Sequence, residues 1–267
     1  MNTHEIINLY TKGLKSMSYI ANKFSIDPRK VKNILQSQGV AVRTRAQQNA
    51  ITNQERGKKV NHDYFNEINS LQKAWVIGFL AADGTVRKNN NSIKIGLSST
   101  DREILEKIKV ELGIEREIHD SETNRGFQIS QLEWSSANQK TQLQKYGVIP
   151  NKTYHSMRLP DFEADDLKLA YLLGYFDGDG CFKNDGGYCR FEICSYRTEI
   201  LESFSSFILE RFGFKKKVLE DKTRNDYYTL TYSTQEAVGI LETLYELELF
   251  SLQRKKEKYM TWKNSRI

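Results

Sequence analysis

Two aspartates, Asp83 and Asp179, are the residues of this sequence best placed to do chemistry, because they occupy matching positions in two copies of one motif. The copies read AWVIGFLAADGTVRK from residue 74 and AYLLGYFDGDGCFKN from residue 170. A carboxylate in the last turn of a helix opposes the negative end of the helix dipole, so another role must justify it. Two carboxylates brought together raise each other's pKa unless a divalent cation compensates, and hard oxygen ligands suit Mg²⁺.

Small residues recur four positions apart within each motif: Gly78 and Ala82 in the first copy, Gly174 and Gly178 in the second. Positions four apart share one face of a helix. Without bulky side chains there, two helices approach more closely than the usual spacing of roughly 8 to 10 Å. We therefore expect the two helices to pack along these faces and to bring the aspartates together. The glycine after each aspartate, Gly84 or Gly180, is expected in the left-handed conformation that ends many helices.

A single Asp-Gly pair is more simply interpreted as the end of a helix and the start of a turn. In this sequence the pair occurs twice, each time after a helix with a small-residue face and before a basic residue, Arg87 or Lys183. Repetition at the length of a domain favours a shared function over two unrelated turns.

The residues after each motif predict the same order of elements in both copies: helix, two strands, helix, two strands, helix. The predicted strands lie near 85–88, 92–98, 115–119 and 126–134, and near 181–183, 188–195, 215–220 and 226–233. Ile93, Ile95 and Leu97 alternate with polar residues, as in a strand with one face covered by helices. The sequence thus predicts an α+β fold of two pseudo-symmetric αββαββα repeats, whose twisted sheets form a polar saddle compatible with a nucleic acid duplex.

Residues 1–45 predict a small all-α domain. A helix over about 16–24 is followed by a tight turn, and Asp27 and Pro28 supply the N-cap and the first turn of the next helix. This pattern resembles a helix-turn-helix, whose second helix enters the DNA major groove. The residues left outside, which are expected to contact DNA, are Arg29, Lys30, Lys32 and Asn33. A three-helix module with a solvated basic face would show the same pattern.

The chain has 267 residues with 40 Lys and Arg against 34 Asp and Glu, a formal charge of +6, which favours a polyanionic partner. A basic stretch begins with Arg43 and Arg45 and leads into a predicted linker over 46–70, which either follows a phosphate backbone or is a solvated tether. The repeats are expected over 71–165 and 166–267. The three cysteines and four histidines show no spacing typical of a zinc site or a disulfide framework.

The segments VIGFLAADG at 76–84 and LLGYFDGDG at 172–180 resemble the paired signature of the single-chain LAGLIDADG homing endonucleases, over about residues 61–262. The resemblance implies that the eighth motif residue, Asp83 or Asp179, binds the catalytic divalent metals. It also includes the preceding residues, Ala82 and Gly178, in the metal site. The sixth position is often acidic in this family, but it is Asp177 in one copy and Ala81 in the other, so no catalytic role is predicted for it.

The family also places a basic residue near the metals after the last helix of a repeat. Lys152 fits this position in the first repeat. In the second repeat both Arg254 and Lys255 are candidates, and the sequence does not decide between them, although we take Lys255 as the catalytic residue. A lysine here is expected to stabilise negative charge on the phosphate or on its water network.

The resemblance implies a monomeric enzyme that cuts both strands of double-stranded DNA by metal-dependent hydrolysis, with Mg²⁺ as the cofactor and Mn²⁺ able to replace it. Outward strand residues are expected to contact the bases: Arg87, Lys94, Gln128, Lys183, Arg190 and Tyr227. Two alternatives stay open, a DNA-binding regulator that does not cut and an RNA maturase. Since no apolar run is long enough to span a membrane, a soluble, cytoplasmic protein of a bacterial or phage-infected cell is expected, without excluding an organellar origin.

Overall fold

The computed structural model describes residues 3–57, 60–185, 187–215, 218–220 and 226–266. The chain divides into two units, Met1–Lys58 and Lys59–Ile267. None of the helices in the described ranges combines the length and the apolar character that a membrane crossing requires.

The first unit consists of α1 (Thr3–Thr11), α2 (Met17–Phe24), α3 (Pro28–Ser37) and α4 (Arg45–Gly57). Side chains cap the N-termini of the two predicted helices: Ser16 accepts a hydrogen bond from the backbone N–H of Tyr19, and Asp27 accepts one from that of Arg29. Between α2 and α3, Ser25 takes the left-handed conformation at φ 53° and turns the chain. The predicted helices and their turn are confirmed.

The three short helices of this unit enclose a small apolar core formed by Ile6, Tyr10, Ile20, Ala21, Val31 and Leu35. These positions follow the spacing expected when α2 packs across α3. The stretch predicted as a linker contains the helix α4, which is not predicted from the sequence.

The second unit contains the two predicted repeats. The first runs α5 (Leu71–Asp83), β1 (Gly84–Val86), β2 (Ser92–Ser98), η1 (Ser99–Asp101), α6 (Arg102–Glu111), β3 (His119–Glu122), β4 (Gln128–Ser135) and α7 (Ala137–Gln144). After the short turn η2 (Lys152–Tyr154), the second runs α8 (Asp165–Asp179), β5 (Gly180–Asp185), β6 (Tyr188–Ser195), α9 (Thr198–Phe212), β7 (Leu219–Glu220), β8 (Tyr228–Ser233) and α10 (Gln235–Glu246). A further helix, α11 (Gln253–Asn264), follows the second repeat. The α+β class and the αββαββα order are therefore confirmed.

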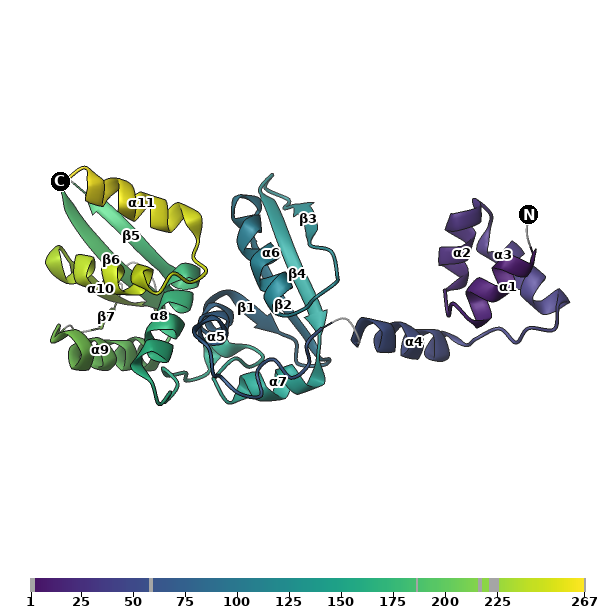
Figure 1. Ribbon diagram of the computed structural model, residues 1–267, viewed down its shortest axis with the longest axis horizontal. Coiled ribbons are helices and arrows are strands. Elements are labelled where there is room, and N and C mark those ends of the chain that lie inside the picture. Colours follow the sequence, from purple (N-terminus) through teal and green to yellow (C-terminus); the bar gives the residue numbers. More distant parts are fainter. Residues whose placement is uncertain (1–2, 58–59, 186, 216–217, 221–225, 267) are drawn as a thin grey trace. The chain divides into compact units, whose positions relative to one another are not determined.

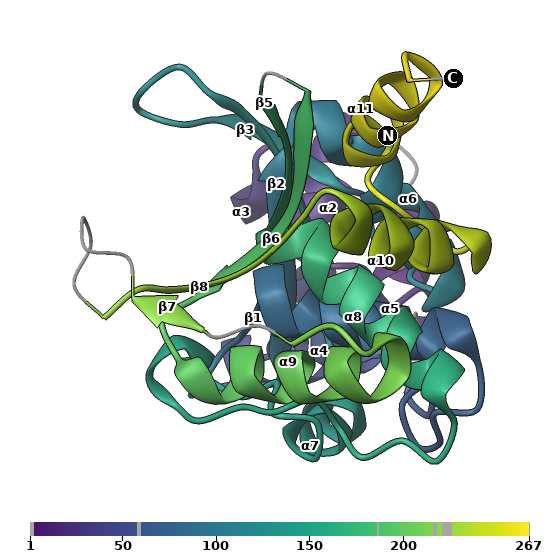
Figure 2. The same ribbon diagram turned by 90° about the vertical axis from the view of Figure 1, so that its left-hand side faces the viewer.

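Each repeat builds one antiparallel sheet, in the order β1-β2-β4-β3 or β5-β6-β8-β7. Helices cover one face of each sheet, as Figure 2 shows for α8, α9 and α10, which lie to the right of β6 and β8 in that view. Along β2 of the first sheet, the buried Ile93, Ile95 and Leu97 point to the helices of the first repeat, and Lys94 and Gly96 point to the other side, which we call the open face. Strand β3 begins at His119, where the strand predicted for 115–119 is expected to end. The strand predicted for 215–220 includes 216–217, which lie outside the described residues, as do 221–225.

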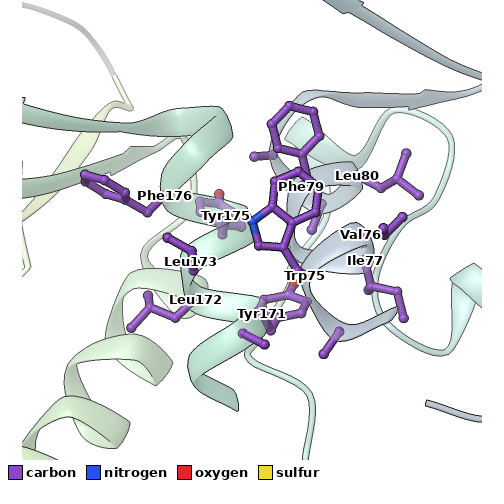
Figure 3. Packing of buried hydrophobic residues seen from close by; sticks show 14 of the residues in the cluster. Trp75, Val76, Ile77, Phe79, Leu80, Tyr171, Leu172, Leu173, Tyr175 and Phe176 are labelled. Carbon is purple, nitrogen blue, oxygen red and sulfur yellow. The ribbon is translucent and has the colours of Figure 1, made fainter. Parts of the chain in front are cut away.

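Helices α5 and α8 lie side by side at the junction of the repeats (Figure 1). A Cβ atom at Gly78 would stand 2.1 Å from the carbonyl oxygen of Tyr171, and one at Gly174 would stand 2.1 Å from that of Trp75. These contacts are reciprocal, since Tyr171 occupies in the second repeat the position of Trp75 in the first. Figure 3 shows Trp75 beside the α8 residues Tyr171 and Tyr175. The close packing expected from the small residues is confirmed.

The glycines after the two aspartates are extended, with φ −71° at Gly84 and −91° at Gly180, so the predicted left-handed conformation is wrong. The reason is that β1 and β5 begin at these glycines and the chain passes from helix to strand without a turn. Glycine is needed for space instead, because a Cβ atom at either position would lie 2.5 Å from a carbonyl oxygen of the preceding helix.

Candidate active site at the ends of the paired helices

The two aspartates meet where α5 and α8 end. A Cβ atom at Gly178 would lie 2.3 Å from the Cβ of Ala82 and 3.4 Å from the carboxyl carbon of Asp83, so the last turns of the two helices touch. Asp83 is half-buried and Asp179 is exposed. Both carboxylates therefore lie at one junction and remain within reach of solvent.

Burial raises the pKa of both carboxyl groups. For Asp83, the nearby cations Lys152, Lys255 and Arg254 oppose this rise. The pKa of Asp179 rises to about 6, through burial first and the negative charge of Asp83 second, with Lys152 and Lys255 opposing. The two charges thus repel each other at a partly buried junction, which is the situation that a divalent cation relieves.

A lysine from the end of each repeat is anchored on the carbonyl groups around each aspartate. Lys152 Nζ donates to the carbonyl oxygens of Ala82 and Gly84, each at 2.5 Å. Lys255 Nζ donates to the matching pair in the second repeat, Gly178 at 3.3 Å and Gly180 at 2.6 Å. The structure therefore identifies Lys255, and not Arg254, as the counterpart of Lys152.

Lys255 Nζ also lies within hydrogen-bond distance of the carbonyl oxygens of Phe176 at 2.7 Å and Asp177 at 2.6 Å, so its three N–H donors are shared among four acceptors. Burial lowers the pKa of both lysines to about 8, while neighbouring aspartates oppose the change. Near neutral pH, both therefore remain mostly protonated and place a positive charge beside the carboxylates.

Asp177, the acidic sixth residue of the second motif, is fully buried and joins three elements. Its carboxylate accepts from the indole Nε1 of Trp75 on α5 at 3.0 Å and from the backbone N–H of Leu252, just before α11, at 3.2 Å. Burial raises its pKa to about 7. These contacts give it a structural part in fixing where α11, and hence Lys255, lies.

Arg254 instead forms an ion pair with Asp101, both of whose carboxylate oxygens lie 3.0 Å from its Nε. This pair connects the start of α11 with the start of α6 in the first repeat. It is not predicted from the sequence, because the two residues are 153 positions apart and neither lies in the motif.

Four of the strand residues expected to contact bases do lie on the open faces: Arg87, Lys94, Lys183 and Arg190, by the alternation of buried and accessible positions. Gln128 does not, because it shares the helix-covered face with Ser130 and Leu132 and donates to Glu122 at 2.6 Å. Tyr227 precedes β8 and packs its ring against that of Tyr196 at 5.1 Å.

Two glutamates on the open faces are not among the residues predicted from the sequence. Glu133 lies 3.8 Å from Arg87, and Glu192 accepts from Lys183 at 2.5 Å. Gln131 also points to the open face, between the buried positions 130 and 132. The apolar Leu132 and Trp134 alternate with Gln131 and Glu133, so the alternation along the strand could have placed Gln131 and Glu133 on the open face.

In the first unit the residues predicted to contact DNA fall into two groups. Those on α3 are exposed, as is the first residue of α4: Arg29, Lys30, Lys32, Asn33 and Arg45. Arg43 is engaged inside the unit, because its guanidinium stacks 3.8 Å from the ring centre of Tyr10 and donates to the carbonyl of Lys15. We therefore leave Arg43 out of the proposed DNA contacts.

Comparison with known proteins gives one matching family and several similar solved structures. The profile described as the LAGLIDADG-like domain matches residues 70–147 and 166–245. Among solved structures, the LAGLIDADG meganuclease I-AabMI bound to uncleaved DNA is 14% identical, over 73% of this chain and 90% of that one, with a TM-score of 0.48. Meganuclease I-SmaMI with DNA is 16% identical (73% and 90%, TM-score 0.49), as is full-length DUF199/WhiA from Thermatoga maritima (78% and 65%, TM-score 0.48). No curated protein matches the sequence significantly.

Proposed function

Because this chain belongs to the LAGLIDADG family, we propose that it is a site-specific homing endonuclease, which makes a double-strand break in a long DNA target by metal-dependent phosphodiester hydrolysis. One observation carries the proposal: two carboxylates, Asp83 and Asp179, meet at the touching ends of α5 and α8, and a buried lysine is anchored beside each. A role in folding alone would not require two repelling charges at the junction of the repeats.

The residues present fit divalent cations that are bound jointly with DNA. The described residues contain no cluster of three His, Cys, Asp or Glu side chains, so the protein offers two hard carboxylates and leaves the other positions to phosphate oxygens and water. We assign the metals to Asp83 and Asp179. The carbonyls of Ala82 and Gly178 also lie at the site, but lysine ammonium groups already use them, so a cation would share these oxygens with a like charge.

When bound, Mg²⁺ or Mn²⁺ supplies a polarised water and stabilises the leaving 3′ oxygen. The chain's own residues position the rest. Lys152 and Lys255 are held by backbone carbonyls, so their charges sit beside each carboxylate without needing to reorganise, and they stabilise the negative phosphate. No protein nucleophile is required.

DNA binding is proposed for both units. The open faces of the sheets present Arg87, Lys94, Lys183 and Arg190, cationic groups suited to phosphates and to guanine. The helix α3 of the first unit would lie in a neighbouring stretch of major groove. Since one chain holds both aspartates, a monomer is sufficient to cut both strands.

The decisive experiment first selects a target by incubating the protein with a randomised duplex library in Ca²⁺, where we expect binding with little cutting. Plasmids with the selected site are then incubated with Mg²⁺, Mn²⁺ or excess chelator. Linear product with Mg²⁺ or Mn²⁺, and none with chelator, is the expected result. Full cutting in chelator contradicts the metal assignment. Tight duplex binding with no cutting in either metal would favour the non-cleaving regulator, and preference for RNA would favour the maturase.

The role of the first unit is tested by deleting residues 1–45, which lie outside the unit that holds the aspartates. Affinity should fall and the dependence of binding on salt should become less steep, since the salt slope decreases by about one for each phosphate that the protein no longer neutralises. Cutting at saturating protein should persist. An unchanged affinity and footprint would show that α3 does not bind DNA.

A further inference from the structure

A pocket of about 240 Å³ has Asp179 in its lining and lies between the ends of α5 and α8, the end of β6 and the segment that follows α7. Its lining includes two cations and several hydroxyl-bearing or aromatic side chains, among them Lys152, Arg197, His155, Tyr175, Ser195 and Tyr227. The volume is below the roughly 300 to 1,000 Å³ of pockets that enclose a whole small molecule. It therefore suits a single small polar group.

Of the two lining cations, Arg197 is the one with N–H donors left for a ligand. It stands between β6 and α9, and its Nε donates to the carbonyl oxygen of Thr153 at 3.2 Å, which holds the guanidinium beside the segment that carries Lys152. A guanidinium has five N–H donors, and among the described residues no carboxylate forms an ion pair with it. An oxyanion with several acceptor oxygens is the natural ligand of such a fork.

The first repeat has the opposite charge at the same position. Asp101 occupies there the position of Arg197, 96 residues earlier, and its carboxylate is bound by Arg254. Phe79 likewise stands where the second repeat has Tyr175, so the phenol near the pocket has no counterpart either. Arg197 and Tyr175 thus have no counterpart of the same residue type in the first repeat.

We propose that this pocket binds one backbone phosphate of the DNA strand that passes over Asp179, and that the matching residue beside Asp83, Asp101 paired with Arg254, does not bind one in this way. The assignment rests on the proposed function only in so far as the chain binds duplex DNA. Phosphate oxygens satisfy the fork of Arg197 and lie near Lys152, and the pocket opens where the open face of the second sheet meets the aspartates. The two strands are therefore held unequally.

The test uses the full chain and the duplex selected from the random library, with binding measured in Ca²⁺ so that cutting is not needed. Each phosphate near the centre of the site is replaced, one at a time, by a neutral methylphosphonate. For the wild type we expect one position, on one strand only, where the replacement weakens binding about tenfold, as expected when a charge-assisted hydrogen bond is removed.

The variant is Arg197→Gln, which keeps a donor for the carbonyl of Thr153 but no charge. It should bind the natural duplex about tenfold more weakly, lower the salt slope by about one, and no longer respond to the methylphosphonate at that position. Arg211→Gln removes an equal charge from the exposed far end of α9 and is the matched control. Arg197→Lys should restore part of the affinity.

A methylphosphonate profile for Arg197→Gln that equals the wild-type profile overturns the pocket, as does equal dependence on Arg197 at the matching phosphate of the other strand. Inorganic phosphate at millimolar concentration should not abolish the Arg197-dependent position; if it does, the pocket takes free phosphate instead. A protein that shows this position and does not cut keeps the pocket and loses the endonuclease proposal. If the protein cuts but shows no methylphosphonate-sensitive position, only the pocket proposal fails. If the protein binds no duplex, both proposals fail.

Discussion

The two ends of the site, around Asp83 and around Asp179, are alike in what they need for metal chemistry and unlike in what surrounds it. Each has a helix that ends in the aspartate, a glycine that starts a strand, and a lysine on the same pair of carbonyls. Around Asp83 lies the ion pair of Asp101 and Arg254, whereas around Asp179 lies a cationic pocket. The helix ends are constrained by close packing, and the residues one layer further out have diverged.

The two lysines also occupy equivalent positions in different surroundings. Lys152 lies in the short turn η2 and binds two carbonyls, whereas Lys255 lies in the twelve-residue helix α11, is 6% exposed and binds four. Asp177 fixes the start of α11, and the first repeat has Ala81 at that position. The two equivalent ammonium groups are thus held by different numbers of carbonyl oxygens.

The largest expected effect comes from removing either carboxylate. Asp83→Asn and Asp179→Asn should each lower the rate of double-strand cleavage by at least about 100-fold, since Lewis-acid stabilisation is worth several kcal/mol. Binding of the duplex in Ca²⁺ should be spared, because the substitution removes one negative charge that faces DNA. Plasmid cleavage and target affinity measure the two quantities.

If the two metal positions serve one strand each, single variants should leave nicked plasmid, and strand-labelled duplex should show which strand each aspartate serves. A folded variant that linearises plasmid at close to the wild-type rate would refute the assignment. A variant that fails to fold would instead indicate a structural role for that aspartate.

A smaller effect is expected on stability, which should fall by different amounts when each lysine is replaced. Lys255→Met leaves four carbonyls without their donor in a buried place and should lower the free energy of unfolding by about 2–4 kcal/mol, whereas Lys152→Met should cost about 1–2 kcal/mol. Methionine retains most of the aliphatic volume, so loss of packing contributes little. Urea unfolding in chelator measures both. Equal losses, or a larger one for Lys152→Met, would contradict the difference in support.

The smallest effect concerns pH in the absence of metal. Burial and Asp83 raise the pKa of Asp179 from 3.8 to about 6, so the folded chain holds this proton more tightly than the unfolded chain does. The resulting stabilisation is present below pH 3.8 and is lost as pH rises through about 6. The melting temperature of Asp179→Asn should therefore exceed that of the wild type at about pH 7 and converge with it near pH 4. Added Mg²⁺ should raise the melting temperature of the wild type more than that of the variant. A difference that is the same at every pH would argue against the raised pKa.

Much of the fold follows from the sequence because it depends on local patterns that occur twice. The alternation of Ile93, Ile95 and Leu97 predicts a strand with a covered face, and the spacing of Gly78 and Ala82 predicts a close helix pair. The conformation of Gly84 is mispredicted, since a glycine after a helix is usually a turn, and only the strand that follows reveals that space is the constraint.

The site is less readable from sequence where it depends on contacts between distant residues. Lys255 is distinguished from Arg254 only by which of the two side chains points to the carbonyls of Gly178 and Gly180. The pair of Asp101 and Arg254 and the bond of Asp177 to Leu252 join segments that share no pattern. Such contacts are set by tertiary packing, which short-range periodicity does not encode.

Every residue of helix α5 from Ala74 to Ala82 is buried, and much of what buries them is α8, nearly a hundred residues later. During synthesis the first repeat therefore emerges with Trp75 and Phe79 exposed to water, and it cannot complete its core until the ribosome has delivered the second. Closing so long a loop is slow. The repeats should consequently fold in a single late step, with the first one vulnerable to aggregation and dependent on chaperones until that moment.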